Sequence, residues 1–203
     1  MRYQHPTILL KFYAILVLLT ALTFNTSAQV VLAQPYFFGG TDSVTIIFDA
    51  SNGNGGLINY NDSVYAHTGV ITNVSNQWRY VKAAWGTADP AVRMTKIGSN
   101  LYRISFRPRT FFGVPANERI KKLAFVFRND DGTVTGRNAD GSDIFIELRD
   151  TTRINCAIIQ PYTDQGNPVL SATAGQSIAF TGIADSSAQL RFELNGVSVA
   201  TGT

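Results

Sequence analysis

The sequence contains very little cysteine. Its 203 residues include one, Cys156, so no intramolecular disulfide can form even in an oxidising compartment. The fold must therefore rest on a hydrophobic core. A module of roughly 110 residues is long enough to bury such a core.

Long apolar runs are absent apart from one near the N-terminus. Residues 12–24, FYAILVLLTALTF, follow a start that carries only positive charges. This run is well under the ~20 residues of a spanning helix, and small residues follow it up to Ala28. We therefore predict a signal peptide over residues 1–28, cleaved after Ala28. Because no cysteine follows the run, a lipid anchor is not indicated. We expect a secreted protein, extracellular or at the cell surface, with no stable membrane insertion.

The net charge is small once this segment is removed. Losing Arg2 and Lys11 lowers the formal charge of the chain from +3 to about +1. Nucleic acid is therefore not indicated as a partner.

The mature chain also has few residues suited to catalysis. One histidine, His67, and one cysteine would remain, which excludes most catalytic triads and histidine-rich metal sites. Asp130, Asp131, Asp140 and Asp143 share one glycine-rich loop, where aspartate favours turns, whereas a glycosidase pair must face each other across a cleft. Their spacing matches no standard calcium loop. We expect no catalytic residue, metal or cofactor in this chain.

Short alternating segments predict an all-β first module, an antiparallel immunoglobulin-like β-sandwich over residues 41–150. Residues 29–40 have no periodicity and are predicted to be an extended lead-in. The one candidate for a helix or helical turn is the short segment from Pro115 to Arg119. Six strands are predicted, over residues 43–50, 62–71, 77–86, 101–108, 121–129 and 143–150.

A second, truncated β-sandwich is predicted after a polar linker at residues 151–154. Residues 155–203 contain further strand-like segments, and Asn195-Gly196 is typical of a type I′ hairpin turn. An immunoglobulin-like domain takes roughly 100 residues, and about half of that follows the linker. We therefore expect the natural protein to continue past Thr203.

Aromatic residues gather in two of the predicted strands of the first module. Trp78, Tyr80 and Trp85 are close in sequence, and Tyr65 and His67 lie on the preceding strand. Alternation would place Trp78 and Tyr80 on one face, and Tyr65 with His67 on one face. For each residue, core packing and ligand contact are equally open. As a group, with polar neighbours, they indicate a stacking platform suited to sugar rings.

The first module carries a series of short motifs in a fixed order. From Asp42 to Leu148 these are VTIIFDA, GNGGL, VYAHTGVIT, W-x-YVK-x-x-WG, M-T-x-IG-x-NLY, FGVPA-x-E-x-I-x-K-x-AFVFRN-DG and G-x-DIF. They resemble the N-terminal domain that precedes the catalytic barrel in secreted bacterial α-amylase-like proteins. More distantly, they resemble starch-binding modules with an aromatic-x-His-x-Gly segment and a following tryptophan. The second segment is similar to immunoglobulin-like spacers.

The resemblance implies a non-catalytic module that binds starch or another α-glucan polysaccharide or oligosaccharide. Starch-binding modules usually also carry a tryptophan in the late loop, and residues 132–143 contain none. A catalytic domain beyond the chain end is a further expected partner. By position, the expected glucan contacts are Tyr65, His67, Trp78 and Trp85, with Asn138 and Asp140 as polar partners.

The alternative is a structural spacer that packs against a neighbouring catalytic domain. Its exposed aromatic residues would then form a protein interface, in which tryptophan and tyrosine are also enriched.

Overall fold

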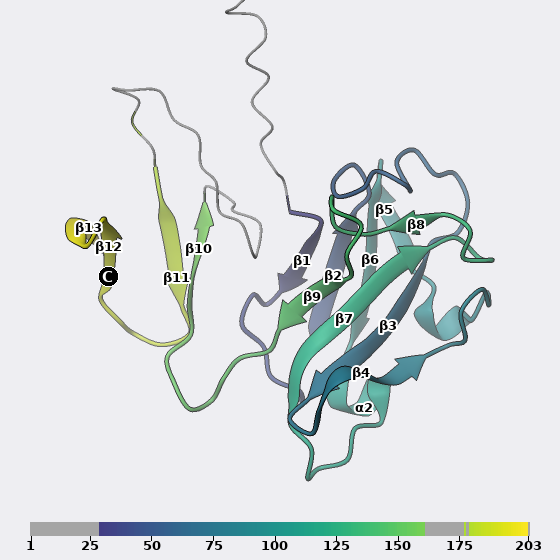
Figure 1. Cartoon of the computed structure of the whole chain (residues 1–203), viewed down its shortest axis with the longest axis horizontal. Helices are drawn as coiled ribbons and strands as arrows, with labels where there is room; N and C mark the ends of the chain where they lie inside the picture. The colour runs from purple at the N-terminus through teal and green to yellow at the C-terminus, as the bar shows by residue number, and fades with distance from the viewer. Residues whose placement is uncertain (1–28, 161–176, 178, 203) are drawn as a thin grey trace, which may run out of the picture.

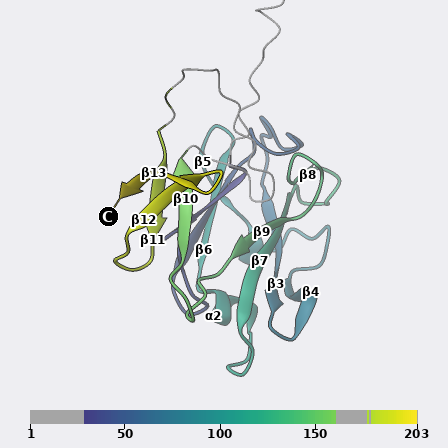
Figure 2. The ribbon, with the colours of Figure 1, turned by 60° about the vertical axis from the view of Figure 1, so that its left-hand side comes forward.

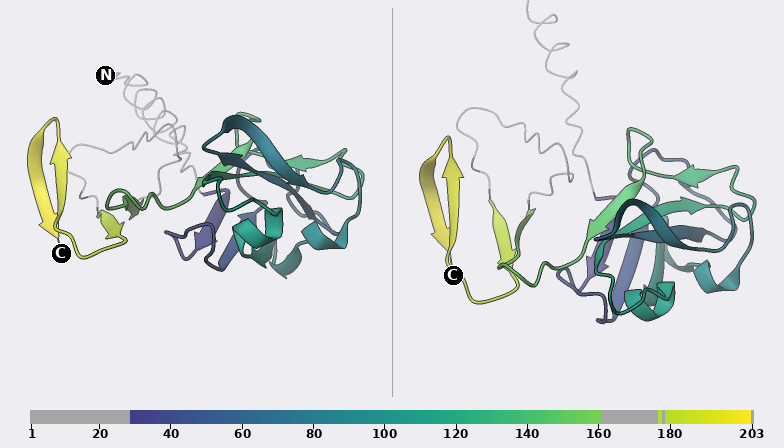
Figure 3. Two further views of the ribbon diagram at one scale, coloured as in Figure 1. Left: turned by 90° about the horizontal axis from the view of Figure 1, so that it is seen from below. Right: turned by 60° about the horizontal axis from the view of Figure 1, so that its bottom comes forward.

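Residues 29–160, 177 and 179–202 are described by the computed structural model. The first module is an all-β sandwich of two antiparallel sheets, seen as two layers in Figures 1 and 3. One sheet has the order β1 (Val31–Gln34), β2 (Val44–Asp49), β6 (Leu101–Phe106), β5 (Thr95–Gly98). The other has the order β4 (Ser75–Lys82), β3 (Tyr65–Thr72), β7 (Ile120–Arg128), β8 (Thr135–Gly136), and β9 (Ile144–Glu147) also pairs with β7. The prediction of an all-β sandwich is confirmed.

The core forms between the sheets because both inner faces carry large apolar side chains. Alternate residues of β2 are buried, and so are Leu123, Phe125 and Phe127 of β7. Phe48 of β2 stacks on Phe127, with ring centroids 4.0 Å apart and an interplanar angle of 13°. Each fully buried phenylalanine contributes about 2–3 kcal/mol of transfer free energy. These contacts fix which face of β3 and β7 points outward.

The prediction of an extended lead-in over residues 29–40 is wrong in one respect, because this segment contains strand β1. Val31 pairs with Phe48 in an antiparallel register, and Val31 and Ala33 are buried in the core. The residues of β1, VLAQ, do not alternate between apolar and polar. Pairing with β2 defines this strand, and that pairing is a long-range contact.

The short helix lies elsewhere than predicted. Helix α2 (Pro108–Phe112) begins at a proline, which suits a first helical position, and ends at Gly113 with φ 72°. The predicted segment from Pro115 to Arg119 is a turn, and Arg109 donates hydrogen bonds to its carbonyl oxygens. Three other short elements were not predicted: β5, β8 and the 3-10 helix η1 (Pro90–Val92).

The described residues of the second segment form two antiparallel two-stranded sheets. Strand β10 (Cys156–Gln160) pairs with β11 (Thr181–Ala184), and β12 (Leu190–Leu194) pairs with β13 (Val197–Gly202). Asn195 and Gly196 have φ 51° and 77°, as a type I′ turn requires, so the predicted hairpin is confirmed.

Residues 1–28, the predicted signal peptide, lie outside the described residues. In the part of the chain that the structure describes, no helix is long and apolar enough to cross a membrane.

Candidate functional site

The outer face of the second sheet has small residues in its middle. Figure 2 shows β9, β7, β3 and β4 side by side, in the order given by their pairing. Along β3 the outward residues include His67 and Gly69, which lie opposite Val126 and Ala124 of β7. Phe145 of β9 lies opposite Ala124 on the other side. The side chains of Trp78 and Val81 pack over Gly69.

A bulge in β4 decides which of its aromatic residues faces outward. Val70 pairs with Arg79 and Thr68 pairs with Lys82, so β4 advances three residues while β3 advances two. Tyr80 lies at this bulge with φ 53°. The bulge reverses the alternation of side chains.

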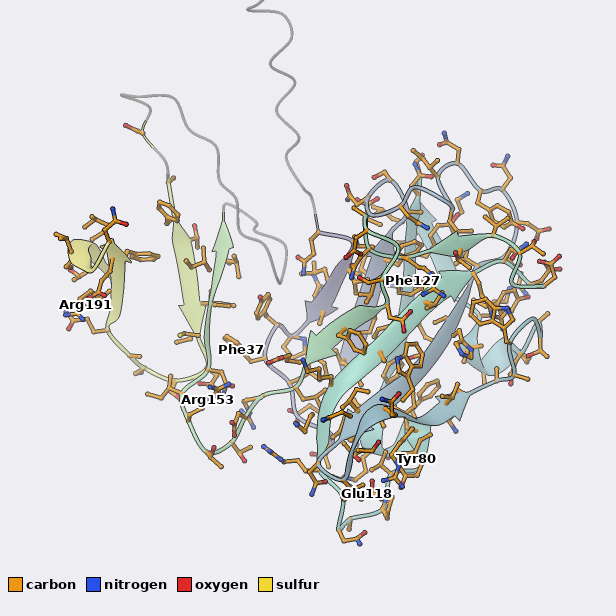
Figure 4. All side chains as sticks on the ribbon, viewed as in Figure 1. Phe37, Tyr80, Glu118, Phe127, Arg153 and Arg191 are labelled. Atoms are coloured by element: carbon orange, nitrogen blue, oxygen red, sulfur yellow. The ribbon has the colours of Figure 1, made fainter. Side chains whose placement is uncertain are left out.

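Tyr80 consequently packs against the core, and its hydroxyl donates to Glu118 at 2.8 Å; both side chains are labelled in Figure 4. Trp78 instead lies over Gly69, where an added Cβ would be 3.3 Å from the indole. The prediction that Trp78 and Tyr80 share one face is therefore wrong.

Four aromatic side chains form a continuous line on this outer face, which we call the aromatic row: Trp85, His67, Trp78 and Phe145. The centroid distances are 4.9 Å for Trp85–His67, 5.7 Å for His67–Trp78 and 6.4 Å for Trp78–Phe145. Trp85 is 45% exposed and Phe145 is 39% exposed, whereas His67 and Trp78 are half-buried. The two rings at the ends of the row, Trp85 and Phe145, are thus exposed to solvent. The half-buried rings of His67 and Trp78 connect them.

Trp85 is held by the turn that follows β7. An added Cβ on Gly132 would lie 2.5 Å from its indole Nε1, so the ring packs directly over that glycine. Gly132 has φ 78°, a conformation that favours glycine. The turn around Trp85 and the turn around Gly132 therefore pack directly against each other.

Arg128 joins these two turns from below. Its side chain is fully buried, and its guanidinium donates to the carbonyl oxygens of Asn129 (2.8 Å), Asp130 (2.9 Å), Ala84 (3.4 Å) and Thr87 (2.7 Å). Its Cζ lies 5.8 Å from the Trp85 ring centroid. Arg128 is thus a positioning residue for the exposed tryptophan.

Tyr65 lies on the same face of β3 as His67, as the alternation predicted, but it is buried. It is 6% exposed, and the Arg128 guanidinium lies 5.6 Å from its ring centroid. Of the six residues predicted to form the site, the structure brings His67, Trp78 and Trp85 into direct ring contact. Tyr65 supports them through Arg128.

Asn138 and Asp140 stabilise the loop between β8 and β9 through hydrogen bonds within it. The Asn138 amide donates to Ser142 Oγ at 3.1 Å and to the Asp143 carbonyl at 2.9 Å, and Asp140 accepts from the Ser142 N–H at 2.9 Å. The hydrogen bonds from Ser142 lower the pKa of Asp140. Asp131 accepts similarly from Thr133. These aspartates therefore form turns, as aspartate favours.

The surroundings of His67 lower its pKa. Burial lowers its pKa, the nearby Arg128 and Arg137 lower it further, and Asp143 opposes them in part. Its Nδ1 atom is buried without a hydrogen-bond partner among the described residues. A neutral imidazole stacked on Trp78 presents an uncharged surface at neutral pH.

The described residues contain no group of three or more histidine, cysteine, aspartate or glutamate side chains that could hold a metal ion. The polar groups beside the row are instead two ion pairs. Lys122 pairs with Glu147 at 2.9 Å, and Arg137 pairs with Asp143. They give the row a rim of hydrogen-bonding groups.

A family described as a domain of unknown function, DUF8578, matches residues 31–135. The chain belongs to this family. No curated protein matches the sequence. The DUF8578 match begins at the first residue of β1, which agrees with the place of this strand in the sandwich. It includes Arg128 and every member of the aromatic row except Phe145.

Sequence reasoning missed Phe145 and Arg128. A signal for Phe145 was present, since Ile144 and Ile146 flank it in an alternating strand and are more buried than it is. Arg128 carried no comparable signal, because its role depends on two turns that are distant from each other in sequence.

Proposed function

We propose that this chain is a non-catalytic, secreted carbohydrate-binding module that holds an α-glucan such as starch on the aromatic row. The observation that carries the proposal is the unbroken ring contact from Trp85 to Phe145 on one outer face. Exposed rings accept the apolar faces of sugars, and the flanking ion pairs can hydrogen-bond to hydroxyl groups.

The sequence resemblance supports the same reading. His67, Trp78 and Trp85 occupy the positions that contact glucan in the starch-binding modules that the chain resembles. Phe145 supplies an exposed ring just after the late loop, which lacks the tryptophan usual in those modules. Two or three stacked sugars bury little area, so Kd should be on the order of 10⁻⁵ to 10⁻³ M for short oligosaccharides.

The test is affinity electrophoresis of the mature chain, Gln29 to Thr203, in gels that contain amylopectin, cellulose or xylan. We expect retardation by amylopectin alone. Trp85→Ala should abolish it with little change in melting temperature, because the ring is 45% exposed. Phe180→Ala is the matched control, since Phe180 is 46% exposed and lies in the second segment.

The second candidate is a spacer whose outer face packs against a neighbouring catalytic domain. The observation that favours it is the exposure of Val81, 43%, beside the row, because an interface core is apolar and a sugar platform needs polar edges. Unchanged mobility in every gel would reject glucan binding and leave the spacer as the better account.

A further inference from the structure

Phe145 belongs to two features of the surface. Its ring contacts Trp78 at the end of the aromatic row, and it also lines a cleft of about 620 Å³. This cleft lies between β9, the segment that follows β1, and the start of β10. The row therefore leads into a concave space.

The cleft repeats the chemistry of the row. Tyr36 and Phe37 line it and meet edge to face, with ring centroids 5.1 Å apart. Arg149 and Arg153 line it as well, and Figure 4 labels Phe37 and Arg153. Arg153 pairs only loosely with Asp150, at 3.4 Å, and its side chain is 70% exposed, so its guanidinium remains available to a ligand.

The continuity of row and cleft points to one occupant. Aromatic rings with hydrogen-bond donors beside them suit a chain of sugar units, and a chain that leaves the row over Phe145 enters the cleft. Two of the cations that line the cleft are paired, Lys122 with Glu147 at 2.9 Å and Arg153 with Asp150 at 3.4 Å, and Arg149 lines it as well.

We propose that the cleft is the second part of one extended glucan site, so that the protein selects long chains over short ones. This inference rests on the proposed function of the aromatic row. Once part of a long chain is bound to the row, binding of the rest of that chain in the cleft is intramolecular. This second contact increases the overall affinity. Maltoheptaose should bind about tenfold more tightly than maltotriose, which occupies the row alone.

The experiment is isothermal titration of the mature chain with maltotriose and with maltoheptaose. We expect Arg153→Gln and Phe37→Ala to weaken maltoheptaose binding about tenfold, towards the maltotriose value, and to leave maltotriose binding unchanged. Arg153→Gln keeps the test valid if Phe37→Ala does not fold, because the Arg153 side chain is 70% exposed. Trp85→Ala should weaken binding of both sugars, and Phe180→Ala should change neither.

Three outcomes overturn the inference, and they differ in what they say of the row. If the wild-type chain binds both sugars with equal affinity and Trp85→Ala loses binding of both, the aromatic row is part of the glucan site and the cleft is not. Unchanged maltoheptaose binding in both cleft variants has the same meaning. No binding of either sugar by the wild-type chain rejects the proposed function together with the cleft.

Discussion

Replacing Arg128 with methionine tests whether a buried guanidinium positions the exposed tryptophan. The substitution keeps a long apolar side chain and removes the donors that join the Trp85 turn to the turn after β7. Three of the four hydrogen bonds that are lost measure 2.7, 2.8 and 2.9 Å. At about 1 kcal/mol net for each, the free energy of unfolding should fall by about 3 kcal/mol. For a module of this size that is a fall of about 10–15 °C in melting temperature.

Two measurements check this expectation. Thermal unfolding followed by circular dichroism reports the loss of stability, and affinity electrophoresis in amylopectin reports the loss of retention at a temperature where the variant is still folded. Retention should fall because the Trp85 turn loses its link to the sheet. Arg103→Met is the matched control, since Arg103 is exposed on β6 of the other sheet and should change neither reading. An Arg128→Met variant that melts within about 2 °C of the wild type and keeps its retention would refute the reasoning.

Three further predictions concern the same region. Gly132→Ala places a Cβ 2.5 Å from the Trp85 indole at a φ of 78°, so it should weaken amylopectin retention and cost about 1 kcal/mol of stability; full retention would contradict the packing. Tyr80→Phe removes a hydrogen bond to the buried Glu118 carboxylate, so chemical denaturation should show a loss of about 1–2 kcal/mol with retention unchanged. Burial lowers the pKa of His67, so the unfolded chain takes up this proton at a higher pH than the folded chain. Stability should therefore be full above about pH 6.5 and fall as the pH drops towards the lowered value; melting curves of His67→Gln should lack this slope, and an unchanged slope would contradict the assignment.

The long strands of the fold were predictable because each carries a pattern of its own. In β2 the buried Val44, Ile46 and Phe48 alternate with less buried residues, which is the period of a strand with one face on a core. In β7 the apolar run LAFVF is dominated by β-branched and aromatic residues. Such patterns are local, and the sequence shows them directly. Strands β1, β5 and β8 show no alternation of apolar and polar residues, and they are defined by pairing with β2, β6 and β7.

The candidate site was predictable in composition and not in arrangement. The sequence placed His67, Trp78 and Trp85 in neighbouring strands, and the structure brings their rings into contact. The sequence also implied that Tyr80 and Trp78 would share one face of the strand, but the bulge in β4 turns Tyr80 to the core. A bulge depends on the register between two strands, and a single strand carries no record of that register.

The sequence by itself determined that this protein is an all-β chain with aromatic residues concentrated in one part of its first module, because alternation and composition are properties of adjacent residues. Only the tertiary structure decided which rings share the outer face, that Phe145 extends their row, and that Arg128 joins two turns beneath Trp85. These features come from contacts between segments that are distant in sequence. Side-chain geometry across strands follows from sheet register and core packing, and both form only when the whole module folds.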